Sequence, residues 1–110
     1  MAKQPETLFK ERVYKLLKKI PGIYFDKIQQ KTKRGSPDFY ICLKGLFIAW
    51  ELKVGKNKAD PLQMYTMEKI AVCGGLVWVV RPDNLEWSLT ELQRIAGMVP
   101  KNISQLEFDR

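Results

Sequence analysis

The sequence predicts an α/β domain in which helices flank a mixed sheet. Three observations support this: apolar residues recur at helical spacing near the N-terminus, two β-rich runs flank a short turn, and a helix-like segment precedes another apolar run. At 110 residues the chain has the length of one domain, with a core expected over about residues 6–82 and an extension over 83–110. The expected order is helix, strand, strand, strand, helix, strand, then a small C-terminal helical addition.

The first helix is expected over residues 6–20 and ends at Pro21-Gly22. Its apolar residues follow one another at steps of three and four: Phe9, Val13, Leu16, Leu17 and Ile20. Residues 23–30 begin with alternating apolar and polar side chains, which favours a strand. A polar, basic loop over residues 31–36 follows.

Residues 39–43 and 46–52 are rich in apolar side chains and are separated by Lys44-Gly45, which predicts two antiparallel strands and a tight turn. The turn type stays open, because asparagine would suit the first position better than lysine. With a two-residue turn, opposed residues have numbers that sum to 89, and one face of the hairpin is wholly apolar. That face holds Phe39, Ile41, Leu43, Leu46, Ile48, Trp50 and Leu52.

The second helix is expected to begin with Asp60 as N-cap and Pro61 at its first position, and to end at a pair of glycines. The apolar run over residues 76–80 predicts a buried central strand, which a helical crossover would place parallel to its predecessor. Ser88 and Glu91 have the spacing of a capping box, which predicts a short last helix ending near Gly97.

The chain contains two cysteines and no histidine. A structural zinc site would need more soft ligands, and imidazole-dependent nucleophilic chemistry is excluded. Any chemistry must therefore use carboxylates, lysine or a hard metal ion. Cys42 and Cys73 lie in apolar stretches and are expected to be buried thiols.

The chain carries a formal net charge of +7, which favours a polyanionic partner such as nucleic acid or an anionic membrane surface. No apolar run approaches the roughly 20 residues of a membrane span. The first residues also lack the apolar stretch of a secretory signal, so we expect an intracellular, cytoplasmic protein.

Two acidic residues are expected to face each other across the hairpin. The predicted register places Asp38 opposite Glu51, and Lys53 points to the same face. Opposed carboxylates repel unless a cation neutralises them, and oxygen ligands suit Mg²⁺ or Mn²⁺. The ammonium of Lys53 could then orient a water or offset charge on a phosphate. A surface carboxylate pair with Lys53 as its ion-pair partner is the structural alternative.

The motif Pro37-Asp38 followed by Glu51-Leu52-Lys53 resembles the signature of the PD-(D/E)XK nucleases, with Gly35 before it and Pro61-Leu62-Gln63 after it. Within that superfamily the chain resembles the small, phage-type VRR-NUC domains over about residues 6–82. The resemblance implies a restriction-endonuclease-like core and an endonuclease that cuts DNA, preferentially branched DNA such as four-way junctions, as a homodimer.

The resemblance also implies site residues. The Mg²⁺ or Mn²⁺ ion would be held by Asp38, Glu51, the backbone carbonyl of Leu52 and a glutamate of the first helix. Helical geometry favours Glu6, which faces the sheet, over Glu11 on the solvated side. A first-turn glutamate can also serve the helix dipole alone. Gln63 resembles the family glutamine that closes over the site, although an exposed helix glutamine fits its position nearly as well.

Basic residues flank the expected site in two loops, and we expect them to contact phosphates without reading sequence. They are Lys31, Lys33, Arg34, Lys56 and Lys58. Any one of them can equally be a solvating charge. A non-catalytic nucleic-acid-binding module and an RNA-directed nuclease therefore remain as alternatives. The apolar residues of the C-terminal segment either form a dimer surface or cover the core: Leu85, Trp87, Leu89 and Leu92.

Overall fold

A computed structural model describes residues 2–29 and 34–99 of the chain. The elements run in the order α1 (Pro5–Leu17), β1 (Tyr24–Lys27), β2 (Phe39–Leu43), β3 (Leu46–Leu52), α2 (Pro61–Val72), β4 (Leu76–Val80), the 3₁₀ helix η1 (Pro82–Asn84) and α3 (Leu85–Ala96). The predicted α/β class and element order are confirmed, and β2, β3 and β4 have the predicted bounds.

The four strands form one mixed sheet in the order β1-β2-β3-β4. β2 pairs antiparallel with β1 and β3, whereas β4 joins β3 in parallel, as its crossover through α2 predicts. The β2–β3 register is the expected one, with Phe39 opposite Trp50. Lys44 and Gly45 turn the chain with φ values of 53° and 84°. Two positive φ values are the mark of a type I′ hairpin turn, so the open question of turn type is answered.

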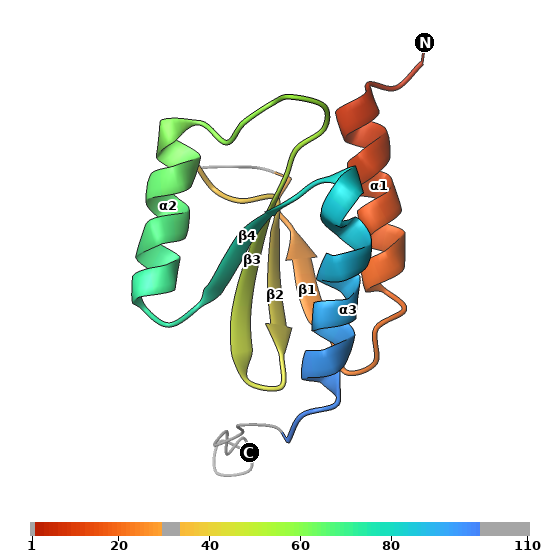
Figure 1. Cartoon of the computed structure of the whole chain (residues 1–110), viewed down its shortest axis with the longest axis vertical. Helices are drawn as coiled ribbons and strands as arrows, with labels where there is room; N and C mark the ends of the chain where they lie inside the picture. Colours follow the sequence, from red (N-terminus) through yellow and green to blue (C-terminus); the bar gives the residue numbers. More distant parts are fainter. Residues whose placement is uncertain (1, 30–33, 100–110) are drawn as a thin grey trace, which may run out of the picture.

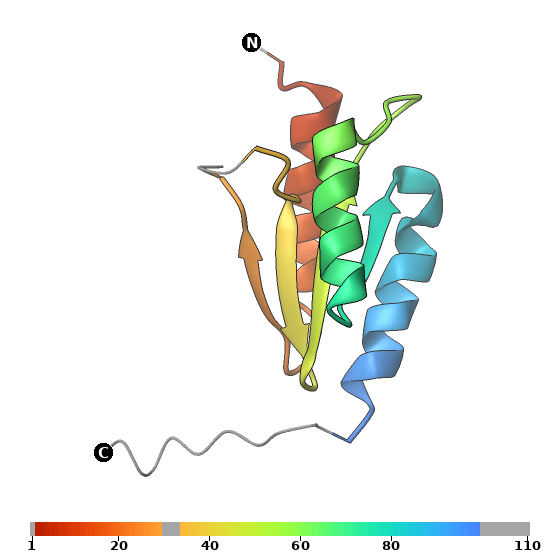
Figure 2. The same cartoon turned by 90° about the vertical axis from the view of Figure 1, so that its left-hand side faces the viewer.

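The helices divide between the two faces of the sheet (Figures 1 and 2). α1 and α3 lie side by side on one face, and α2 alone covers the other. The predicted apolar face of the hairpin lies under α1 and α3, where Phe39, Ile48, Trp50 and Leu52 have no exposed surface. The core is therefore built on one side of the sheet, while the side under α2 is smaller and more polar.

The C-terminal segment covers the domain's own core. Leu85 and Leu92 of α3 are buried in the core cluster, and Leu89 packs against it. Trp87 stays 57% exposed, with its ring edge-on to Trp78. Of the two expectations for this segment, the structure supports packing within the chain for three of its four apolar residues.

The last strand is not central as predicted. β4 is an edge strand that pairs only with β3, and its residues are exposed or half-buried apart from Val80. An apolar run reports side-chain composition, but the position of a strand depends on its pairing partners. The central, buried strand is β3, whose last five residues are all buried.

The last helix begins earlier than the Ser88 capping box predicts. α3 starts at Leu85 and continues directly from η1, and it ends next to Gly97 as expected. Ser88 is fully buried inside the helix, where its hydroxyl accepts a hydrogen bond of 2.9 Å from the indole N–H of Trp78. The serine that looked like a cap instead joins α3 to the edge strand.

Two further boundaries differ from the prediction. α1 ends at Leu17, and the chain continues to buried Ile20 through a tighter turn in which the amides of Lys19 and Ile20 each reach back three residues. The first strand spans Tyr24–Lys27 and does not include residues 23, 28 and 29 of the predicted range, whose last residue, Gln30, lies outside the described residues. Hydrophobic spacing continues through such a turn, so it cannot mark the helix end.

Both cysteines are exposed, contrary to the prediction. Cys42 lies on the α2 side of the sheet, which one helix cannot cover fully, and Cys73 is the C-cap of α2. The general preference of cysteine for the interior predicted the wrong environment for both. Within the described part of the chain, no helix has the length and apolar character to span a membrane.

Candidate functional site

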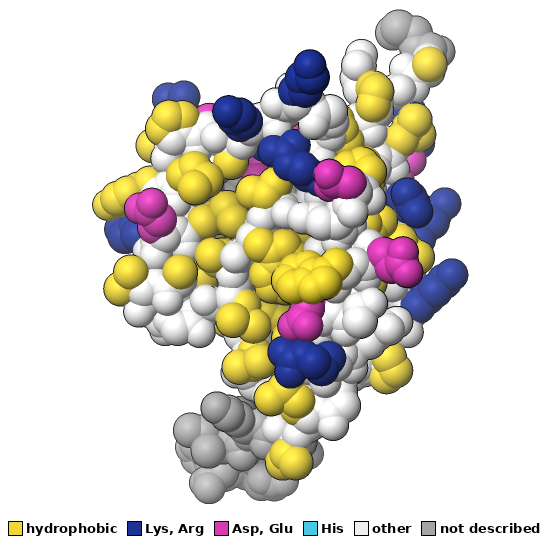
Figure 3. All heavy atoms as spheres, in the orientation of Figure 1, with side chains coloured by type: hydrophobic (Ala, Val, Ile, Leu, Met, Phe, Trp, Pro, Cys, Tyr) yellow, Lys and Arg dark blue, Asp and Glu magenta, His cyan; other side chains and the backbone are white. Residues whose placement is uncertain are grey.

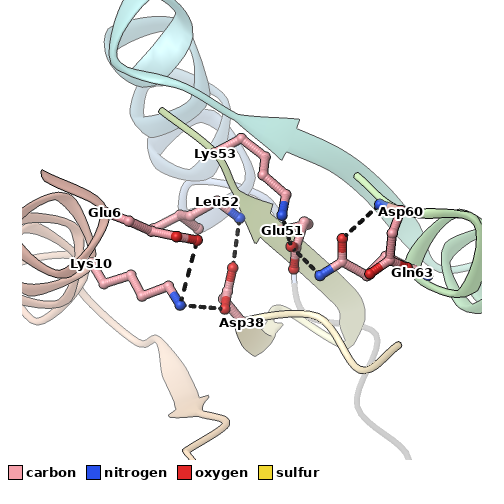
Figure 4. Close-up of polar contacts among 8 residues, drawn as sticks. All are labelled: Glu6, Lys10, Asp38, Glu51, Leu52, Lys53, Asp60 and Gln63. Atoms are coloured by element: carbon pink, nitrogen blue, oxygen red, sulfur yellow. Dashed lines mark hydrogen bonds and ion pairs between the residues drawn. The ribbon is translucent and has the colours of Figure 1, made fainter. Parts of the chain in front are cut away.

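Four chain segments meet at one end of the sheet (Figure 4). The last residues of β3 lie beside Asp38, the residue that precedes β2. The first turns of α1 approach from one side and the first turn of α2 from the other. The polar side chains that converge there are Glu6, Lys10, Asp38, Glu51, Lys53 and Gln63. Three of the predicted site residues, Asp38, Glu51 and Lys53, are thus close together, and Gln63 joins them.

Asp38 is a buried carboxylate, with 3% of the residue exposed. One oxygen accepts a hydrogen bond of 2.8 Å from the backbone N–H of Leu52, and the other lies 3.1 Å from Nζ of Lys10. Burying a charge is costly unless it is paired and hydrogen-bonded. Both contacts therefore stabilise the ionised form of Asp38 in the folded chain.

Asp38 does not face Glu51 as a regular rung of the hairpin, which corrects the predicted register at this one position. The ladder ends at Phe39 and Trp50. The N–H of Asp38 then donates to the carbonyl of Trp50 at 3.0 Å, one residue out of step. Pro37 comes before Asp38 and has no N–H for a further rung, so the chain leaves the ladder here. This bulge brings the carboxylate of Asp38 to the amide of Leu52.

Glu51 is 1% exposed and lies on the α2 side of β3, because Trp50 and Leu52 face the core. Its Oε2 accepts a hydrogen bond from the side-chain amide of Gln63 and lies 3.3 Å from Nζ of Lys53. The side chain of Lys53 is itself only 15% exposed. The Gln63 amide and the partly buried Lys53 ammonium therefore both stabilise the negative charge of Glu51.

Gln63 is held in place by the start of α2. The side chain of Asp60 accepts from the N–H of Gln63, and the side-chain oxygen of Gln63 accepts from the N–H of Asp60, both at 2.9 Å. This reciprocal capping box uses the amide oxygen and leaves the NH₂ group to donate to Glu51. The sequence predicted both the cap and the position of Gln63 but did not connect them.

Gly35 brings the segment before β2 against the start of α2. It has a φ of +84°, and a Cβ added there would lie 2.7 Å from the carbonyl oxygen of Leu62. Only glycine allows this approach without moving the backbone. The contact places Asp38 and Gln63, which come from different elements, at the same end of the sheet.

Lys10 is a site residue that the sequence analysis missed. Its ammonium lies 3.1 Å from Asp38 and 3.8 Å from Glu6. Burial lowers the pKa of Lys10, but the charge of Asp38, the hydrogen bond to Asp38 and the charges of Glu6 and Glu51 together outweigh burial, so the pKa is raised above its ordinary value. The only signal in the sequence was the Glu6–Lys10 spacing of four, which places both residues on one helix face.

The two candidate glutamates of α1 point to different places. Glu6 approaches Asp38 through Lys10, whereas Glu11 forms an ion pair with Lys3 at 2.6 Å. Their side chains are similarly exposed, 41% for Glu6 and 38% for Glu11. Direction rather than solvation therefore distinguishes them.

The basic residues expected to contact nucleic acid are only partly described. Arg34, Lys56 and Lys58 are exposed, while Lys31 and Lys33 lie outside the described residues. Arg81, which follows β4, donates to the carbonyl of Gly55 at 3.3 Å and so adds a basic side chain beside the loop that holds Lys56 and Lys58.

Asp38 and Glu51 offer oxygen donors that suit a hard divalent cation. In the described part of the chain, no three His, Cys, Asp or Glu side chains gather closely enough to hold a metal ion by themselves. Ammonium groups occupy the space beside both carboxylates, so a cation there would have to move Lys10 or Lys53. The arrangement can therefore pair buried charges, or hold a cation together with water and substrate oxygens.

Comparisons with known proteins assign no family to the chain: no protein-family model matches it, and a search of curated proteins finds no match.

Proposed function

We propose that this chain is an endonuclease that hydrolyses phosphodiester bonds in DNA with the help of Mg²⁺ or Mn²⁺. The proposal rests on one observation: two carboxylates, Asp38 and Glu51, are almost fully buried at one end of the sheet, each beside a lysine. Buried charges destabilise a small domain unless they are compensated, and clusters of this kind gather at functional sites. The sequence resemblance to the PD-(D/E)XK nucleases points to the same residues.

The donor set fits a hard cation. Asp38 and Glu51 would supply carboxylate oxygens, and Glu6 could reach the ion if Lys10 moved aside. Leu52 directs its N–H toward Asp38, and an extended residue points its carbonyl toward the same neighbouring strand. The Leu52 carbonyl is therefore the fourth candidate ligand. When bound, the ion would polarise a phosphoryl oxygen and make a nearby water more acidic.

The side chains around the carboxylates have separate tasks in this proposal. Lys53, held beside Glu51, orients the attacking water or offsets charge that builds on the phosphate. Lys10 stabilises the negative charge of Asp38. When a cation takes the place of the Lys10 ammonium beside Asp38, that ammonium can pair with a substrate phosphate instead. Gln63 holds Glu51 in one orientation through the cap of α2.

The net charge of +7 suits a polyanionic substrate, and Arg34, Lys56, Lys58 and Arg81 lie exposed or half-exposed in segments next to the site. These side chains would contact phosphates and position the strand. Preference for branched DNA and action as a homodimer are proposed on the sequence resemblance alone.

The decisive experiment compares the wild type with Asp38→Asn, Glu51→Gln and Lys53→Ala on single-stranded, duplex, flapped and four-way DNA, with Mn²⁺ or with a chelator. Glu91→Gln is the matched control, because its carboxylate pairs with Arg94 on α3, away from the site. We expect cleavage by the wild type and the control only with metal, and a loss of at least about a hundredfold in the three site variants.

Calorimetric titration with Mn²⁺ separates binding from chemistry, since Lys53→Ala should still bind the ion whereas Asp38→Asn should bind it weakly. DNA binding without cleavage by the wild type would contradict the proposal and favour a non-catalytic nucleic-acid-binding module. If the same residues cleave RNA but not DNA, the protein is an RNA-directed nuclease and the proposed DNA substrate is wrong.

A further inference from the structure

Two adjoining hollows run along α1 and β1, away from the loop that holds Lys56 and Lys58. The first, of about 330 Å³, opens at the site and is lined by Thr7, Lys10, Lys27, Ile28, Gln29 and Asp38. The second, of about 440 Å³, is lined by Lys3, Glu11, Tyr14, Lys15, Lys27 and Gln29. They share Lys27 and Gln29, so together they form one groove that begins at Asp38. We call it the α1–β1 groove.

The groove is electropositive. Lys3 neutralises Glu11 in an ion pair of 2.6 Å. Among the described residues, no carboxylate lies within ion-pair distance of Lys15 or Lys27. The pKa of Glu11 is lowered first by its hydrogen bond to Lys3 and also by the charges of Lys15 and Lys27. All three ammonium groups therefore lie near the Glu11 carboxylate. Two positive charges are therefore left to attract an anion.

An aromatic ring forms part of the groove wall. Tyr14 is 37% exposed, and its ring meets Phe25 edge-on with centroids 5.3 Å apart. Phe25 in turn packs against buried Phe39, so the ring of Tyr14 is supported from the core. Figure 3 shows Lys and Arg side chains along the α1 flank as well as at the upper end of the molecule. Positive charge beside a supported ring is the combination that binds phosphates and stacks an unpaired base.

We propose that the α1–β1 groove binds an unpaired nucleic-acid strand next to the phosphate that the cation at Asp38 would hold. Lys27 lies between the two hollows and contacts the phosphate of the strand that is nearest the site. Lys15 contacts the next phosphates along the strand, and Tyr14 packs against a base. The ligand class rests on the proposed function, whereas the path rests on the geometry of α1 and β1. The strand would thus leave the site over α1 rather than only across the 54–58 loop.

The test measures binding without metal, so that cleavage plays no part. The probe is a fluorescein-labelled oligo-dT of about 12 nucleotides, matched by a duplex of the same length, in fluorescence anisotropy with a chelator. Lys15→Glu/Lys27→Glu is compared with Lys19→Glu/Lys69→Glu, which changes the net charge equally outside the groove. Tyr14→Leu tests the ring, and circular dichroism checks that each variant folds.

We expect the groove double variant to bind oligo-dT at least about tenfold more weakly than the control double variant, with a salt dependence shallower by roughly 1.4 in logarithmic slope for two lost phosphate contacts. Tyr14→Leu should weaken binding about fivefold or more. Equal losses of oligo-dT affinity in both double variants would contradict binding in the groove, because the affinity would then depend on net charge alone. Failure of the proposed function is seen separately, as intact groove binding without any metal-dependent cleavage by the wild type.

Discussion

The charges of Asp38 and Glu51 are tolerated in the interior because each has a hydrogen-bond donor and an ammonium. Asp38 has the Leu52 amide and Lys10, and Glu51 has Gln63 and Lys53. Removing one partner of such a pair costs more than the pair contributes, since the other charge stays buried. The stability of the domain should therefore respond to the lysines of the site.

Replacing Lys10 with methionine tests this dependence, because it removes the ammonium and keeps most of the length of the side chain. We expect the free energy of unfolding at neutral pH to fall by about 1–2 kcal/mol, less than for a fully buried pair, because the Lys10 side chain is 27% exposed and Asp38 keeps the Leu52 amide. Urea unfolding measures the change. Lys15→Met, on the same helix, should stay within about 0.5 kcal/mol of the wild type.

The effect of Lys10→Met should also depend on pH. The pKa of Lys10 is raised in the folded chain, so its stabilising contribution is complete below its ordinary value of 10.5 and is lost as the pH rises through the folded-state pKa. The difference in stability between the wild type and Lys10→Met should thus stay constant up to about pH 10 and narrow as the pH rises further through the folded-state pKa. Burial raises the pKa of Tyr40 in both proteins alike. A constant difference would show that Lys10 acts by packing alone.

At the scale of the elements, the position of Gly35 against Leu62 controls how α2 meets the sheet. Gly35→Ala forces a Cβ to 2.7 Å from the Leu62 carbonyl and places alanine at a φ of +84°. We expect a loss of about 2–4 kcal/mol in unfolding free energy and a shifted side-chain amide resonance of Gln63 in ¹H–¹⁵N NMR spectra.

Gly22→Ala separates backbone strain from the clash. Gly22 also has a positive φ, +72°, but no described atom lies within 4 Å of an added Cβ. This control should cost only about 1–2 kcal/mol and leave the Gln63 resonance in place. If both variants move that resonance equally, the contact with Leu62 does not position Gln63.

The attachment of α3 to the edge strand gives a second prediction at this scale. Ser88→Ala removes the acceptor of the Trp78 indole N–H inside a buried contact, which should cost about 1–2 kcal/mol in thermal or urea unfolding. Thr90→Ala is the control, because the exposed Thr90 hydroxyl bonds only the carbonyl of Glu86 in its own helix. Equal effects would mean that the Trp78 hydrogen bond adds nothing to stability.

For the whole molecule, sequence reasoning was accurate where the signal is local. Alternation and a two-residue turn predicted β2, β3 and their register, and Asp60 with Pro61 predicted the start of α2. It failed where the answer depends on packing between elements. Three features depend on how distant segments pack together: the edge position of β4, the burial of Ser88 and the approach of Lys10 to Asp38. The spacing of residues along the chain does not predict such packing.

The unequal faces of the sheet predict unequal local stability. α1 and α3 share a continuous apolar core, whereas Met67 is the only buried residue of α2, which leaves Tyr65 and Val72 57% and 88% exposed. Segments with few buried contacts open before the rest of a domain. In native-state hydrogen exchange, the amides of α2 should therefore exchange well before those of β2 and β3. Exchange of all three at one rate would show that the domain opens only as a unit. Because Gln63 reaches Glu51 from α2, early opening of this helix would also release the donor that holds the carboxylate.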